Sequence, residues 1–242
     1  MARTVRKSGV KEVPLSEIKG DPSRFLREAE MPRSIGRALE RLPSVVYHLT
    51  YADNAASIAR DGLHPAAALL KEAGVAESEA NAFRRAAITL PGGAVLRNQR
   101  PMPPNALSRC LDSPLTPEDW YALVNSRVFF WLDQDRLSRH RTVGRASPQI
   151  FYAVSTARLL ERYAAFVELS PFNSGSALRR AAGRGRRTFV PLADWTQRGW
   201  KSEALPGAAP RPPSHQPAEL TVRCSIPDFL SLVIDASHIA PT

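Results

Sequence analysis

The chain has 242 residues, of which 43% are hydrophobic and 23% are charged, a balance typical of a globular protein rather than a disordered one. No apolar run approaches the roughly 18 residues of a membrane span, and no apolar segment follows the charged N-terminus. We therefore expect no membrane partner, no secretory signal and a cytoplasmic location. The two cysteines, Cys110 and Cys224, fit a reducing compartment.

Arginine dominates the charge, with 33 Lys and Arg against 23 Asp and Glu, and lysine occurs only five times. An excess of this size favours an anionic partner, such as nucleic acid or a phosphorylated cofactor. The other interpretation is that a GC-rich coding sequence enriches arginine without any function. The charge alone leaves both open.

The first predicted elements lie before residue 63. Residues 1–43 are interpreted as an N-terminal extension, with a second short helix at "PRSIGRALERLP". Residues 44–51, "SVVYHLTY", are β-branched and aromatic enough for a strand. Asp53 or Asn54 could cap the helix that follows, and Gly62 suits the C-terminus of that helix.

The middle of the chain alternates helices and strands. Residues 64–90 are alanine-rich and predict helix, whereas "LPGGAVLRNQRPMPPN" predicts a loop. Thr116 is the expected cap of the next helix, with Pro117 at its first position and Asp119 completing a capping box. Strands are predicted at "RVFFWL", "PQIFYAV" and "AAFVEL", with a helix at "TARLLERY" capped by Ser155.

The last quarter is more irregular. A Ser/Asn/Gly turn at "SPFNSGSA" leads into five arginines within residues 179–187. Residues 203–217 are Pro-rich and predict a surface loop. "AELTVRCSI" alternates polar and apolar residues, which predicts a strand with Glu219 and Leu220 on opposite faces. Together the elements indicate an α+β domain over residues 44–242.

The common catalytic motifs are absent from the sequence. The five histidines form no spaced ligand pair with each other or with the cysteines, so we expect no metal. There is no P-loop, no strand-borne G-x-G-x-x-G and no G-x-S-x-G elbow.

Several segments nevertheless resemble known families. "YHLTYADNAASIARDGL" is similar to the first strand and helix of the ADP-ribosyltransferase fold, as in the DarT-type DNA ADP-ribosyltransferases and the poly-ADP-ribose polymerases. "LTPEDWYALVNSRVFFWLDQDRL", "LSPFNSGSA", "TFVPLADW" and "AELTVRCSIPDF" resemble an uncharacterised bacterial family catalogued as a domain of unknown function. This likeness covers roughly residues 44–236, and the order of elements links that family to the transferase fold.

The transferase resemblance implies a split β-sheet core with peripheral helices and NAD as co-substrate in a cleft between the halves. Three strands supply a histidine, an aromatic and a glutamate, which here would be His48, Phe130 or Trp131, and Glu219. The carboxylate would stabilise the oxocarbenium-like state, and the ring would hold the cationic nicotinamide. The full set of expected cofactor-binding residues is His48, Thr50, Asn54, Gly62, Phe130, Trp131, Asn173 and Ser174.

Each of these residues also has an ordinary structural interpretation. His48 could be a hydrogen-bonded core histidine, and the "VFFW" rings are more often core than cofactor stack. Because side chains alternate along a strand, Phe129 and Trp131 should share one face and Phe130 the other. Glu219 could be an unremarkable strand residue beside a Pro-rich loop.

The group that accepts ADP-ribose is inferred from one difference between this sequence and the transferase pattern, and from the basic charge of the chain. Transferases that modify protein arginine carry an acid or amide two residues before the catalytic glutamate, and here that position is Pro217. The sequence therefore favours nucleic acid as acceptor, and the family resemblance implies a toxin or phage-defence role. The expected nucleic-acid-binding residues are Arg179, Arg180, Arg184, Arg186 and Arg187.

Three other hypotheses stay open from the sequence. The same fold could act as an NAD glycohydrolase or phosphorylase. The chain could also be a non-catalytic nucleic-acid-binding module that uses its arginines. Finally, "KEVPLSEIKGDPSRFLREAE" resembles the start of prevent-host-death antitoxins, which suggests that the N-terminal segment inhibits the domain in cis.

Overall fold

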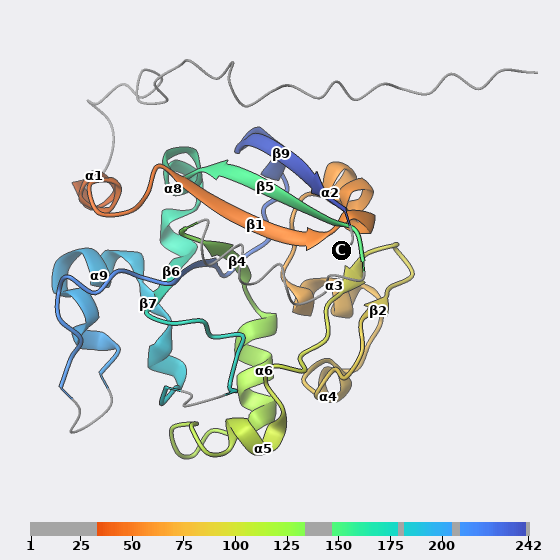
Figure 1. Ribbon diagram of the computed structural model, residues 1–242, viewed down its shortest axis with the longest axis horizontal. Helices are drawn as coiled ribbons and strands as arrows, with labels where there is room; N and C mark the ends of the chain where they lie inside the picture. Colours follow the sequence, from red (N-terminus) through yellow and green to blue (C-terminus); the bar gives the residue numbers. More distant parts are fainter. Residues whose placement is uncertain (1–32, 134–146, 179–181, 205–208, 241–242) are drawn as a thin grey trace, which may run out of the picture. The chain divides into compact units, whose positions relative to one another are not determined.

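The computed structural model describes residues 33–133, 147–178, 182–204 and 209–240 (Figure 1). Residues 32–242 form one compact unit. Helix α1 (Arg33–Leu39) belongs to this unit, because Arg41, just after the helix, lies 3.8 Å over the ring of Trp195 in helix α9 (Leu192–Arg198). The unit therefore begins about ten residues before the predicted domain boundary at 44. The antitoxin-like segment lies outside the described residues.

A seven-stranded antiparallel sheet with helices packed around it forms the described part of the fold, which confirms the α+β class (Figure 1). The strand order is β7-β6-β8-β4-β1-β5-β9. The strands are β1 (Val45–Tyr51), β4 (Val128–Trp131), β5 (Gln149–Ser155), β6 (Val167–Ser170), β7 (Val190–Pro191), β8 (Glu219–Val222) and β9 (Val233–Ile239). A separate short hairpin joins β2 (Ile88–Thr89) to β3 (Val95–Leu96).

The sheet is weakly joined at its centre. β1 pairs with β5 at every position from Val45 to Tyr51, and β4 pairs with β8 along its whole length. Between β1 and β4, however, the register contains one pair, Tyr47 with Trp131. The sheet thus consists of two well-paired groups of strands, β7-β6-β8-β4 and β1-β5-β9, that touch at a single pair.

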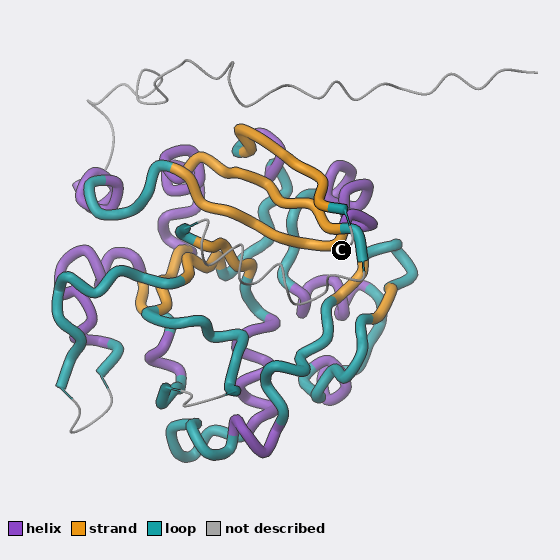
Figure 2. Tube along the Cα trace, in the orientation of Figure 1, coloured by secondary structure: helices purple, strands orange, loops and turns teal. Residues whose placement is uncertain are grey.

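The helices largely follow the sequence prediction. They are α2 (Ala55–Asp61), α3 (Ala66–Glu72), α4 (Glu77–Ala80), α5 (Pro104–Leu107), α6 (Pro117–Asn125) and α8 (Thr156–Tyr163), besides α1 and α9. Short 3-10 turns occur at Ala52–Asn54, Ala164–Phe166, Arg186–Thr188, Gly199–Ser202 and Phe229–Ser231. Helix is wrong for most of 73–90, and much of the chain between α4 and α6 is loop (Figure 2).

Local signals in the sequence set two helix starts correctly. Thr116 accepts a hydrogen bond from the Asp119 amide while the Asp119 carboxylate accepts one from the Thr116 amide, which is the predicted capping box of α6. Ser155 caps α8 by accepting from the amide of Arg158. The buried Trp120 of α6 anchors a core cluster on one side of the sheet.

Strand β8 is buried on both faces, which its alternating sequence does not predict. Glu219, Leu220, Thr221 and Val222 are all buried because β8 lies between β6 and β4 with structure on either side. The polar residues of β8 therefore lie on a buried face of the sheet and not on a solvent-exposed one.

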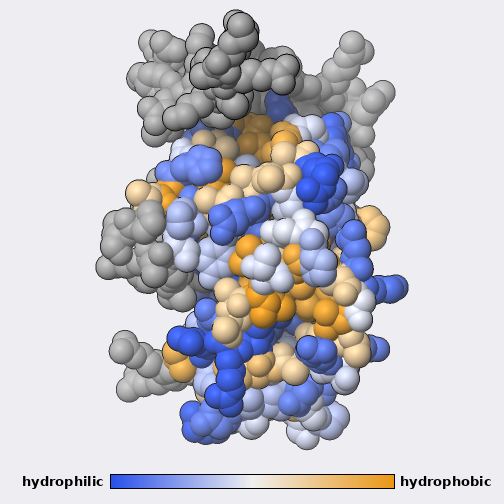
Figure 3. Space-filling view, turned by 90° about the vertical axis from the view of Figure 1, so that its right-hand side faces the viewer, coloured by the Kyte–Doolittle hydropathy of each residue, from blue (hydrophilic) through white to orange (hydrophobic). Residues whose placement is uncertain are grey.

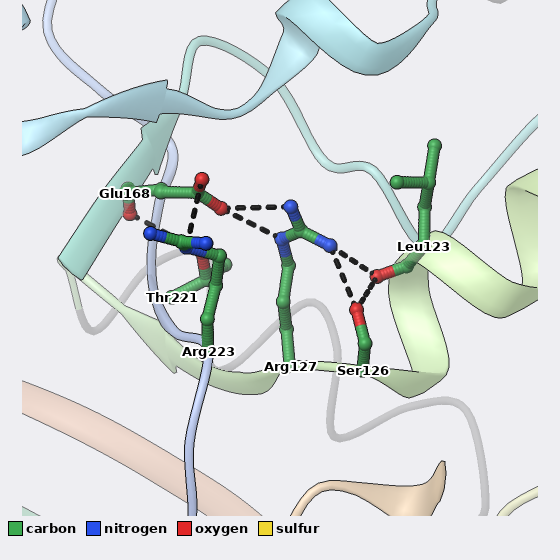
Figure 4. Close-up of polar contacts among 6 residues, drawn as sticks. All are labelled: Leu123, Ser126, Arg127, Glu168, Thr221 and Arg223. Carbon is green, nitrogen blue, oxygen red and sulfur yellow. Dashed lines mark hydrogen bonds and ion pairs between the residues drawn. The ribbon is translucent and has the colours of Figure 1, made fainter. Parts of the chain in front are cut away.

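A network of ion pairs is centred on Glu168 of the neighbouring strand β6 (Figure 4). The Glu168 carboxylate of β6 accepts from Arg127 at 2.9 Å and pairs with Arg223 at 3.0 Å. Arg127 also donates to the carbonyl of Leu123 and to the Ser126 hydroxyl, at the end of α6. The network ties α6, β4, β6 and the residue after β8 together.

Candidate functional site

A cavity of about 490 Å³ lies beside the weak junction of the sheet. Its walls come from β1, β4 and β8, from helices α2 and α3, and from the loop that carries the β2–β3 hairpin. On this side of the molecule, apolar side chains gather in the middle and polar side chains surround them (Figure 3). The volume falls within the range of small-molecule sites.

Most of the predicted site residues line this one cavity. His48 comes from β1, Trp131 from the end of β4, and Glu219 from the start of β8. The other predicted residues in its wall are Thr50, Asn54, Gly62 and Asn173. Residues up to 171 positions apart in the chain therefore meet at a common site, as the resemblance implied.

His48 lies where β1 and β4 separate. Its Nδ1 is 3.0 Å from the backbone carbonyl of Phe129, so the imidazole bridges the two strands just past the Tyr47–Trp131 pair. Neighbouring residues of a strand point to opposite faces, so His48 and Trp131 leave the sheet on opposite faces. Both side chains nevertheless line the cavity, which lies where strands β1 and β4 separate.

The protonation state of His48 follows from its surroundings. Burial lowers the pKa of His48 to about 4, the carbonyl of Phe129 opposes that shift, and the charge of Arg97 adds to it. The ring is therefore neutral at pH 7. Because a carbonyl can only accept, Nδ1 must carry the proton and donate it to Phe129, which leaves Nε2 as a hydrogen-bond acceptor.

Glu219 is 2% exposed and lies between Trp131 of β4 and Ser170 of β6 in the sheet register. Its Oε2 accepts a hydrogen bond of 3.0 Å from the amide of Ser174. The carbonyl of Ser174 in turn accepts from the guanidinium of Arg184 at 3.2 Å. The predicted turn at "SPFNSGSA" thus orients the carboxylate through its backbone.

Asn54 has a different role from the helix cap that we expected. No side-chain capping bond is present at the start of α2. Instead the Asn54 side chain accepts from the amide of Val95 at 2.6 Å and donates to the Val95 carbonyl and to Thr50 Oγ1. This clamp fixes strand β3 against β1, and so it shapes the cavity rather than the helix terminus.

Gly62 is required at its position for two reasons. Its φ of +87° is the predicted left-handed conformation at the end of α2. A Cβ there would also lie 2.4 Å from the carbonyl oxygen of Ile226 and 2.5 Å from Cα of Pro227. The absence of a side chain thus lets α2 approach the segment after β8.

Two of the predicted cofactor-binding residues, Phe130 and Ser174, are buried and do not line the cavity. Phe130 is fully buried and packs against Phe229 rather than lining the cavity, because it alternates with Phe129 and Trp131, which both line it. Of the three rings of β4, Phe129 and Trp131 are therefore the two in the cavity wall. Ser174 is also fully buried and acts through its amide.

Arg184 requires a correction. It is 2% exposed, with its guanidinium 5.5 Å over Trp120 and 5.1 Å over Phe172, so it supports the turn and cannot reach a bound nucleic acid. Arg186 and Arg187 are exposed. Arg179 and Arg180 lie outside the described residues.

The sequence analysis missed the arginines on the other side of the cavity. Arg84 and Arg97 both line it, and burial lowers the pKa of each guanidinium from its ordinary value without discharging it. Arg97 also lies 5.0 Å over the ring of Tyr51. A signal was present, because residues 80–111 contain five arginines and no acidic residue.

The described part of the chain contains neither a candidate metal site nor a candidate membrane-spanning helix. No group of three or more His, Cys, Asp or Glu side chains there is arranged to hold a metal ion. Nor does any described helix have the length and apolar character needed to cross a membrane.

Comparison with known proteins gives a family but no activity. No curated protein matches the chain. The model of a family of unknown function, DUF7002, matches residues 44–233. This range includes β1, β4 and β8 and therefore every strand that lines the cavity. The chain belongs to the DUF7002 family.

Proposed function

We propose that this protein is an ADP-ribosyltransferase that uses NAD as co-substrate and modifies nucleic acid. One observation carries the proposal: a histidine, an aromatic and a glutamate from three adjacent strands line one cavity where the two groups of strands separate. That is the arrangement implied by the resemblance of residues 47–63 to the transferase fold. The cavity wall is mostly apolar but also carries the charged groups of Arg84, Arg97 and Glu219, and fixed charges in such a site suit a reaction that develops charge.

The residues have distinct roles in this proposal. The Nε2 acceptor of His48 takes a hydrogen bond from a ribose hydroxyl of NAD. Trp131 holds the cationic nicotinamide ring against its face. Arg97 and Arg84 supply positive charge for the diphosphate, since both already line the cavity.

The proposed chemistry is substitution at the ribose carbon that carries nicotinamide. The C–N bond breaks, its electron pair leaves with neutral nicotinamide, and the ribose passes through an oxocarbenium-like state. The Glu219 carboxylate stabilises that positive charge, held by the Ser174 amide at 3.0 Å. A nucleophilic atom of a nucleobase then bonds to the same carbon and loses a proton to solvent.

The test is NAD consumption by the purified full chain with and without single-stranded DNA or RNA. We expect nicotinamide release that needs the oligonucleotide, with transfer of mass to it. Glu219→Gln should lower the rate by about 10²- to 10³-fold, as for removal of a transition-state stabiliser. Glu161→Gln, an exposed position of α8, is the matched control and should leave the rate unchanged.

The outcomes separate the hypotheses. Nicotinamide release that ignores the oligonucleotide would mean an NAD glycohydrolase, and our proposal of transfer would be wrong. No NAD binding or turnover, together with oligonucleotide binding that survives Glu219→Gln, would mean a non-catalytic module. Growth arrest on expression that Glu219→Gln relieves would support the toxin or phage-defence role.

A further inference from the structure

The loop that carries the β2–β3 hairpin presents a second group of arginines. We define the arginine loop as residues 84–100, with Arg84 and Arg85 at one end and Arg97 and Arg100 at the other. The whole stretch of residues 80–111 lacks any acidic residue. This segment of the cavity wall therefore contributes only positive charge, and the family resemblance did not identify it.

The two ends of the arginine loop are held side by side by hydrogen bonds to backbone. The Gln99 amide donates to the Arg84 carbonyl at 2.7 Å. Arg84 Nε donates to the Arg97 carbonyl at 2.6 Å, and Arg100 Nε donates to the Arg85 carbonyl at 2.8 Å. The guanidinium groups of Arg84 and Arg100 are thus held on a preformed loop, which reduces the entropy lost when they bind a ligand.

The four arginines divide into an inner and an outer pair. Arg84 and Arg97 line the cavity, whereas Arg85 and Arg100 are exposed, and each is the chain neighbour of a residue in the cavity wall. Among the described residues, none of the ion pairs involves Arg84, Arg85 or Arg100. The outer pair is thus exposed beside the cavity wall, with the Arg85 guanidinium 5.6 Å over the ring of Phe83 and Arg100 held by the Arg85 carbonyl.

We infer that Arg85 and Arg100 bind the phosphate backbone of single-stranded nucleic acid and lead a base into the cavity. Guanidinium forks match phosphate geometry, and their position beside the wall residues sets the direction of the strand. A single strand is favoured because a base inside a duplex cannot reach an enclosed site without leaving the stack. This inference rests on the proposed function, since it assigns the acceptor's binding surface.

The arginine run at 179–187 is the natural comparison for this surface. Arg184 is buried in it, Arg187 donates to the carbonyl of Ala204, and none of the described members lines the cavity. The described part of that run therefore supports the Ser174 turn through Arg184 but places no arginine in the cavity wall.

The experiment measures binding without NAD, so that it is independent of catalysis. A fluorescein-labelled single strand of about 16 nucleotides, the upper size of a single-stranded site, is titrated with the full chain between about 50 and 200 mM salt. The test variant is Arg85→Gln/Arg100→Gln, and the matched control is Arg37→Gln/Arg198→Gln, two exposed arginines of α1 and α9 that do not line the cavity. Equal melting temperatures show that the variants are folded.

We expect the arginine-loop variant to bind about tenfold or more weakly at low salt, and its salt slope to fall by about 1.4, the value for two lost phosphate contacts on a single strand. The control should change neither. Unchanged affinity in the arginine-loop variant, or a larger loss in the control, would overturn the inference. So would a loss confined to binding of phosphatidylserine vesicles.

The same variants distinguish this inference from the proposed function. Oligonucleotide binding that depends on Arg85 and Arg100 in a chain that consumes no NAD would support the surface and reject the transferase. NAD turnover that depends on Glu219 and needs an oligonucleotide, but with unaltered binding by the arginine-loop variant, would support the transferase and reject the surface.

Discussion

Two buried glutamates on neighbouring strands have opposite surroundings. Glu168 of β6 is enclosed by two guanidinium groups, Arg127 and Arg223, with a geometry that satisfies its charge (Figure 4). Glu219 of β8 receives the backbone amide of Ser174 and lines the cavity. Two buried side chains of one type thus differ in their described partners, since Glu168 contacts two guanidinium groups and Glu219 contacts a backbone amide at a cavity wall.

The largest expected effect on stability is at Glu168. Glu168→Gln leaves Arg127, whose side chain is 7% exposed, without its buried counter-charge. Removing one partner of a buried pair costs about 3–5 kcal/mol. The free energy of unfolding, measured with urea, should fall by that amount. A loss under about 1 kcal/mol would show that the network is not a stabilising element.

Glu219→Gln should give the reverse pattern. The amide oxygen of Gln can still accept from Ser174, so we expect the free energy of unfolding to change by less than about 1 kcal/mol. NAD turnover should fall by about 10²- to 10³-fold. If both glutamates affected stability equally and turnover not at all, the contrast between them would be false.

The cavity should also impose a pH dependence on stability through His48. The pKa of His48 is about 4 in the folded chain and about 6.5 when the chain unfolds, so the unfolded state binds the proton more strongly between these values. Stability should therefore rise as pH increases from about 4 to about 6.5, by at most roughly 3 kcal/mol.

His48→Gln is the variant that tests this pH dependence. It should flatten that part of the stability profile, because it removes the group that titrates. Urea unfolding at several pH values between 4 and 7 measures the slope. A slope that persists in the variant would assign the pH dependence to other groups.

The smallest expected effect on the free energy of unfolding is at Arg223, the more exposed of the two arginines that pair with Glu168. The side chain of Arg223 is 46% exposed, against 7% for Arg127. Exposed ion pairs contribute about 0–1 kcal/mol, so Arg223→Gln should lower the free energy of unfolding by less than about 1 kcal/mol. Arg127→Gln should cost several times more, and equal costs would contradict the difference in burial.

The sequence predicted best what depends on neighbouring residues. The Thr116–Asp119 capping box and the shared face of Phe129 and Trp131 follow from spacing alone. Glu219 and His48 were found through resemblance. By contrast, the burial of Arg184 and the pairing of Glu168 depend on contacts across the fold, which no local pattern encodes.

The arginine loop shows the same limit in another form. Arg84 and Arg97 line the cavity because the Asn54 clamp holds Val95 against β1, a contact across 41 residues. Composition pointed to residues 179–187 because arginines are densest there. The density of arginines along the sequence therefore does not predict which arginines line the cavity.

The strand order has a consequence for folding during synthesis on the ribosome. β1 pairs with β4 and β5, and β4 pairs with β8, so β1 and β4 acquire these partners only after a much later part of the chain has been synthesised. Contacts of such long sequence separation slow folding. The cavity wall includes Glu219, so the cavity is incomplete during most of the synthesis of the chain.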